Sequence, residues 1–155
     1  MYSRHFVRIV LDINVLIAAF ATRGLCEDVL RTVLAEHELV VSEFILGELE
    51  RVLREKLKMP SPRVRAVTDF IRRTSLVVEP TDPSNWPEND PDDQWIVATA
   101  MIGDAQLLVS GDRDLLNASQ KFQLRSLALA SSGNDSSSWR VLHCMSNGRV
   151  SMLFN

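Results

Sequence analysis

The chain has 155 residues, which suits one domain with a single substantial core, and its 46% hydrophobic and 24% charged residues are typical of soluble globular proteins. The net charge of −3 excludes general electrostatic attraction to nucleic acid, so any such binding needs a local basic surface. Two distant cysteines exclude a disulfide framework, and neither a membrane span nor a signal peptide is apparent, so we expect a cytoplasmic protein that does not enter the membrane.

Taken in chain order, short apolar runs alternate with amphipathic segments. The first run, residues 6–11, is β-branched and almost wholly apolar, which is typical of a strand buried on both faces in a parallel sheet. Further strands are predicted over residues 39–41, 76–78 and 107–109, and helices over residues 15–20, 24–36, 42–57, 63–73 and 92–102. This alternation predicts an α/β fold with a mainly parallel sheet.

Asp12 directly follows the first predicted strand. In open parallel sheets, ligands bind at the carboxyl ends of the strands, so a functional role is one interpretation. A turn or helix-capping aspartate is the other interpretation, and the residues alone do not decide between them.

Glu48 belongs to the helix that Ser42 is expected to cap. Its spacing places it within the apolar stripe of that helix, which consists of Ile45, Leu49, Val52 and Leu53. A carboxylate directed at a core is costly unless a partner such as a cation compensates for it. The alternative is a glutamate at the edge of the stripe that reaches solvent.

A third acidic segment opens the helix predicted over residues 92–102. Asp90 is the expected N-cap, with Pro91 at the first helical position and Asp93 in the first turn. The positive end of a helix dipole favours acids there, so this segment alone does not indicate a site.

A fourth segment follows the strand predicted over residues 107–109. Asp112 and Asp114 either cap a short helix or face Asp12 across the sheet edge. Carboxylates gathered at one edge repel each other unless a cation bridges them, and such oxygen ligands suit Mg²⁺ or Mn²⁺. These ions organise the attack of water on a phosphodiester, so the pattern favours a metal-dependent nuclease.

Four segments between residues 7 and 116 resemble the motifs of PIN domains, in the same order and spacing. Residues 10–16 resemble the opening strand with its first metal-binding aspartate, here Asp12. The segment around Glu48 resembles the helix that carries the family's glutamate.

The third and fourth PIN motifs also have counterparts in this sequence. The key aspartate of the third falls on Asp93, and Asp112 is the better match in the fourth, with Asp114 as an auxiliary acid. Ser110 matches the hydroxyl residue that often precedes the fourth acid.

The resemblance implies a three-layer α/β/α sandwich and an endoribonuclease that uses Mg²⁺ or Mn²⁺ to hydrolyse RNA. Asp12, Glu48, Asp93 and Asp112 would hold the metal and orient water. Asn14 would support Asp12 by a hydrogen bond, and Asp90 would be a further supporting residue. The match is nearest to the branch of toxins from toxin–antitoxin pairs, which implies a homodimer and a protein antitoxin that blocks the site.

Basic residues are concentrated between residues 51 and 73. Together with residues nearer the acids, they suggest an RNA-contacting set of Arg23, Arg51, Arg54 and Arg113. The alternative is an ordinary solvated helix face with ion pairs such as Glu50 with Arg54.

The resemblance ends after residue 116. We expect a domain over residues 1–130 and an atypical tail over residues 131–155, whose Ser-rich start is typical of a linker and whose remainder forms either a hairpin or disorder. An adjacent reading frame over residues 123–139 can encode a strand and a helix with suitable codons. A frameshift that loses or replaces the fifth strand is therefore a second explanation of the tail.

Two other functions compete with the nuclease. A non-catalytic PIN scaffold that binds RNA or a protein partner is the main alternative, and the presence of all four acids argues against it. A phosphatase or receiver domain is disfavoured, because the sequence has no Asp-x-Asp-x-Thr run after the first strand.

Overall fold

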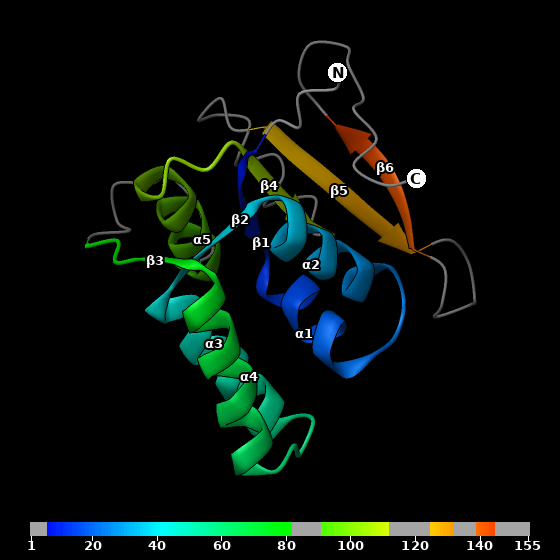
Figure 1. Cartoon of the computed structure of the whole chain (residues 1–155), viewed down its shortest axis with the longest axis vertical. Coiled ribbons are helices and arrows are strands. Elements are labelled where there is room, and N and C mark those ends of the chain that lie inside the picture. The colour runs from blue at the N-terminus through cyan, green and yellow to red at the C-terminus, as the bar shows by residue number, and fades with distance from the viewer. Residues whose placement is uncertain (1–5, 82–90, 112–124, 132–138, 145–155) are drawn as a thin grey trace.

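A sheet of six strands forms the centre of the part of the chain that the structure describes (Figure 1). The structure is a computed structural model that describes residues 6–81, 91–111, 125–131 and 139–144, the last two segments as backbone only. The strand order is β3-β2-β1-β4-β5-β6. The strands are β1 (Arg8–Leu11), β2 (Glu38–Ser42), β3 (Leu76–Val78), β4 (Leu107–Ser110), β5 (Arg125–Ser131) and β6 (Trp139–Cys144).

The first five strands are mutually parallel, and only β6 runs antiparallel, beside β5. The prediction of a mainly parallel sheet is therefore confirmed. Strand β1 lies between β2 and β4, with Ile9 aligned with Leu39 on one side and with Leu107 on the other. The carboxyl ends of these three strands consequently meet at one edge of the sheet.

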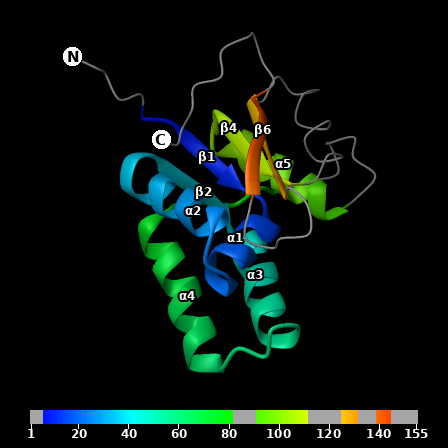
Figure 2. The same cartoon turned by 90° about the vertical axis from the view of Figure 1, so that its right-hand side faces the viewer.

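Five helices are described: α1 (Ile13–Ala21), α2 (Leu25–Glu36), α3 (Glu43–Glu55), α4 (Ser61–Thr74) and α5 (Pro91–Ile102). Helices α2 and α5 cover opposite faces of the sheet, as Figure 2 shows, which confirms the three-layer arrangement. Helices α3 and α4 form a hairpin that extends beyond the sheet. None of the described helices is long and apolar enough to cross a membrane.

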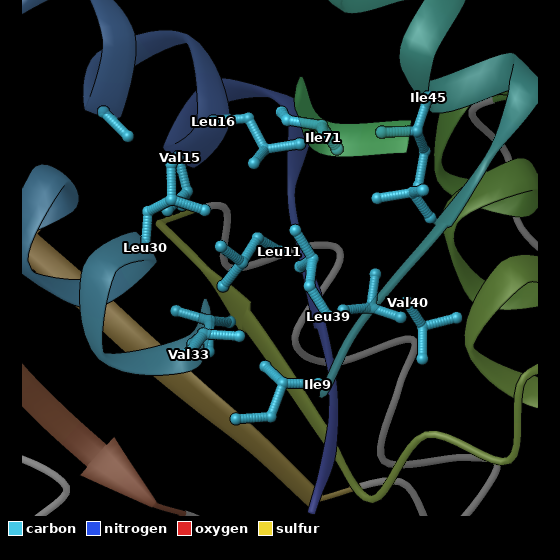
Figure 3. Close-up of a cluster of buried hydrophobic side chains, with 14 of the residues drawn as sticks. Ile9, Leu11, Val15, Leu16, Leu30, Val33, Leu39, Val40, Ile45 and Ile71 are labelled. Carbon is cyan, nitrogen blue, oxygen red and sulfur yellow. The ribbon is translucent and has the colours of Figure 1, made fainter. Parts of the chain in front are cut away.

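The core lies on both faces of the central strands (Figure 3). Ile9, Val10 and Leu11 of β1 are all at most 1% exposed, which explains why this strand has no polar–apolar alternation. Leu16 of α1 and Leu30 of α2 pack on one face, so the start of α1 is held firmly against the end of β1.

Several elements differ from the sequence-based expectation, since β1 begins at Arg8 instead of residue 6 and α1 begins at Ile13 instead of residue 15. Helix α4 begins at Ser61, two residues earlier than predicted, because Pro62 lies within its first turn, where proline has no hydrogen bond to lose. Strand β5, which was not predicted, lies beside β4, so the fifth strand is present. In the tail, for which a hairpin or disorder was expected, residues 139–144 form β6 beside β5, and residues 145–155 lie outside the described residues. The boundary at residue 130 stays a prediction.

Candidate active site

Asp12 follows β1 and is only 5% exposed. It occupies the N-cap position of α1, and its carbonyl accepts the N–H groups of Val15 and Leu16, yet its side chain makes no capping hydrogen bond. The Ser110 hydroxyl instead donates to Asp12 Oδ2 at 2.7 Å. Capping by the carboxylate therefore does not explain this residue, because its side chain points toward β4 rather than toward the helix N–H groups.

Ser110 is the last residue of β4 and is fully buried. The N–H of Asp12 donates to the carbonyl of Val109 at 2.9 Å, so the β1–β4 pairing continues to the point where the Asp12 side chain begins. Strand β4 thus holds Asp12 at two points, its backbone N–H and its carboxylate. Asp112 and Asp114, which follow β4, lie outside the described residues.

Glu48 lies at the edge of the buried face of α3, which consists of Ile45, Leu46, Leu49 and Leu53. The prediction that Val52 shares this face was inexact, because Val52 is only half-buried and Leu46 takes its place. The Glu48 side chain is 24% exposed.

Arg51 is the charged partner of Glu48. Its Nη2 lies 2.7 Å from Glu48 Oε2, and its Nε also donates to the carboxylate. The hydrogen bond from Arg51, opposed in part by burial, holds the pKa of Glu48 below its ordinary value. Glu48 is therefore ionised at neutral pH, as a metal ligand must be.

Helices α3 and α5 are joined by a polar and an aromatic contact that the sequence did not reveal. Inside, the hydroxyls of Thr99 and Ser42 lie 2.8 Å apart, and Ser42 caps α3 as predicted by accepting the N–H of Ile45. Nearer the surface, the rings of Phe44 and Trp95 stack with centroids 5.2 Å apart. These contacts fix the first turn of α3 against α5.

Asp93 lies in the first turn of α5 and is half-buried, whereas its neighbour Asp92 is exposed. It shares a helix face with Ile96 and Val97, both of which are buried. Asp93 therefore begins the stripe by which α5 packs on the sheet. Asp90, the expected N-cap of this helix, lies outside the described residues.

Within the described residues, no three acidic, histidine or cysteine side chains form a group that could hold a metal ion. The donor types nevertheless fit a hard cation, because the candidate ligands are all carboxylates and one of them, Asp12, is buried and held by a hydroxyl. Asn14 is exposed in the first turn of α1, and the supporting role expected of it stays a prediction.

Two of the arginines expected to contact RNA are engaged in ion pairs. Arg51 pairs with Glu48, and Arg54 pairs with Glu50, the pair that the alternative interpretation named. Arg23 is exposed, and Arg113 lies outside the described residues. The exposed basic residues of this region that make no ion pair with any described residue are Lys56, Lys58, Arg63, Arg65 and Arg73.

The family model described as the PIN domain matches residues 8–114. The chain belongs to the PIN domain family. PIN domains are generally nucleases, and the matched span contains Asp12, Glu48, Asp93 and Asp112. No curated protein matches the sequence significantly.

Several solved structures resemble this PIN domain. One is VapBC2 from Rickettsia felis bound to a DNA fragment from its promoter, with 13% identity, a TM-score of 0.51, and coverage of 75% of this chain and 91% of that chain. A domain of a functionally unknown protein from Methanocaldococcus jannaschii has 14% identity, a TM-score of 0.54, and coverage of 88% and 99%. The PIN domain endonuclease Utp24 has 19% identity, a TM-score of 0.50, and coverage of 80% and 86%. At these identities the likeness shows the fold.

Proposed function

We propose that this PIN domain is an endoribonuclease that depends on Mg²⁺ or Mn²⁺. The observation that supports this most strongly is the Asp12 carboxylate, which is buried at the carboxyl end of the central strand and is held by Ser110 instead of capping α1. A carboxylate held in this place offers oxygen ligands to a hard cation such as Mg²⁺ or Mn²⁺ at the edge of the sheet where ligands bind in parallel folds.

Asp12, Glu48, Asp93 and Asp112 would hold the ion, with Asp114 as an auxiliary acid. The bound ion would lower the pKa of water and stabilise the leaving oxygen of the phosphodiester. The chain itself contributes rigidity, because Ser110 fixes the carboxylate of Asp12. Exposed arginines on α4 would bind the phosphates of RNA.

We also propose that the protein is the toxin of a toxin–antitoxin pair, acting as a homodimer that a protein antitoxin inhibits. The motif match and the structural likeness to VapBC2 support this proposal. Induced expression should arrest growth, and the Asp12→Asn variant should not. Equal growth with both proteins at equal expression would contradict the toxin role while leaving nuclease activity open.

The enzymatic proposal is tested with purified protein and a set of structured and single-stranded RNAs. We expect internal cleavage with Mn²⁺ or Mg²⁺, no cleavage with chelator, and recovery when metal is restored. Release of phosphate from small esters without RNA cleavage would indicate a phosphatase instead.

A non-catalytic PIN scaffold is the second candidate, and the Arg51–Glu48 pair favours it, because an arginine already occupies a carboxylate that a metal would need. A scaffold would bind RNA equally well with metal or with chelator and leave it intact, whereas the nuclease would cleave it only with metal.

A further inference from the structure

Helices α3 and α5 are joined by a buried pair of hydroxyl groups. Thr99 on α5 and Ser42 at the start of α3 are both fully buried, and their hydroxyl oxygens lie 2.8 Å apart although 57 residues separate them. The Thr99 hydroxyl also lies 2.7 Å from the carbonyl of Trp95, and Ser42 Oγ accepts the N–H of Ile45 at 3.4 Å.

The chemistry of these groups fixes the direction of each hydrogen bond. Because a carbonyl oxygen only accepts, the Thr99 hydroxyl uses its one proton on Trp95. The Ser42 hydroxyl therefore donates to Thr99 while its oxygen caps α3. Each hydroxyl is both donor and acceptor, so the loss of Thr99 Oγ1 leaves a buried donor on Ser42 without this acceptor.

The stacked rings strengthen the same junction. Phe44 lies two residues after Ser42, and Trp95 lies one helical turn before Thr99, so the aromatic and polar contacts join the same two helical segments. Their ring planes differ by 14°. The hydroxyl pair, whose hydrogen bond has a preferred direction, is buried, and the stacked rings lie nearer the surface.

We infer that Thr99 is a positioning residue, whose hydroxyl acts through Ser42 to set the separation of the carboxylates of Glu48 and Asp93 for a divalent cation. Glu48 lies four residues after Phe44, on the side of α3 that meets α5, and Asp93 lies in the first turn of α5. Each helix thus carries one proposed ligand, and the Thr99–Ser42 bond joins the helices. This inference rests on the proposed function, because it assumes that both carboxylates are ligands.

The test uses Thr99→Val, which keeps the shape of the side chain and removes the hydroxyl. Thr68→Val is a matched control, because Thr68 is also a buried helical threonine, but its hydroxyl bonds only to carbonyls of its own helix, α4. Thr99→Ser restores the hydroxyl. Binding of Mn²⁺ alone is measured by calorimetry on the full chain, with folding checked by circular dichroism.

We expect Thr99→Val to weaken Mn²⁺ binding about 10-fold, since groups that orient ligands typically have effects of this size, and Thr68→Val and Thr99→Ser to bind as the original protein does. The single-turnover rate of RNA cleavage by Thr99→Val should fall at limiting Mn²⁺ and recover at saturating Mn²⁺. A merely structural role would not produce recovery by metal.

Several outcomes overturn the inference. Unchanged Mn²⁺ binding by folded Thr99→Val does so while leaving the nuclease intact, and equal weakening by Thr68→Val would indicate general destabilisation. If Thr99→Val does not fold, the double variant Ser42→Ala, Thr99→Val leaves no hydroxyl unpaired, although the N–H of Ile45 loses its cap, and unchanged Mn²⁺ binding by this variant overturns the inference. If the unmutated protein neither binds Mn²⁺ nor cuts RNA, the proposed function fails as well.

Discussion

Ser110→Ala should destabilise the protein measurably, although it removes only one oxygen atom. Ser110 is fully buried, Asp12 is 5% exposed, and the hydroxyl lies 2.7 Å from the carboxylate. A short hydrogen bond to an ionised group contributes about 1.5–3 kcal/mol. The free energy of unfolding should fall by that amount, which lowers the Tm of a domain of this size by about 3–12 °C.

Chemical denaturation measures this change directly, and the m-value should stay constant because the same surface is exposed on unfolding. A double-mutant cycle with Asp12→Ala isolates the pair, since Ser110→Ala should cost little once the carboxylate is absent. The reasoning is refuted if Ser110→Ala costs less than about 0.5 kcal/mol, or if its cost is the same with and without the carboxylate.

Three further predictions concern charged surface residues. Arg51→Ala should release Glu48 for the metal and lower the Mn²⁺ concentration for half-maximal cleavage by up to about 5-fold, the limit for an exposed ion pair; a higher requirement would contradict this. Glu43→Gln should lower the free energy of unfolding by less than about 1 kcal/mol at neutral pH and leave it unchanged in acid. The reason is that pairing lowers the pKa of Glu43, so the stabilisation disappears as the pH falls through that pKa. Urea denaturation at both pH values measures the difference. Arg63→Ala with Arg73→Ala should lower the slope of log RNA affinity against log salt by about 1.4, and an unchanged slope would exclude both arginines as phosphate contacts.

Local signals predicted the elements that depend on local chemistry. Strand β3 spans the three predicted residues, and Ser42 caps α3 as expected, because β-branched runs and capping side chains act within a few residues. The continuous burial of β1 also follows from its unbroken apolar sequence.

The sequence could not choose between a capping and a functional Asp12, since both need a carboxylate at that position. The choice depends on Ser110, which is 98 residues away in the chain and adjacent only after β1 pairs with β4. The Thr99–Ser42 contact was missed for the same reason, because nothing near either residue indicates the other.

The surface charges illustrate a further limit. Arg51 and Arg54 were expected to contact RNA, but each pairs with a glutamate one turn away on α3. The spacing allowed both outcomes, and exposed side chains of this length choose partners by small energy differences. The exact buried face of α3 also depended on its packing against α1 and α4, which replaced Val52 by Leu46.

The central claim is that Asp12 belongs to a metal-dependent site that cuts RNA. Its most direct test is single-turnover cleavage of a labelled RNA with Mn²⁺ by the original protein, by Asp12→Asn and by Asp28→Asn, a control at an exposed aspartate on α2. We predict cleavage that chelator abolishes, that Asp12→Asn loses and that Asp28→Asn retains. Metal-dependent cleavage that survives in Asp12→Asn, or intact RNA with the folded original protein under every metal condition, would contradict the account.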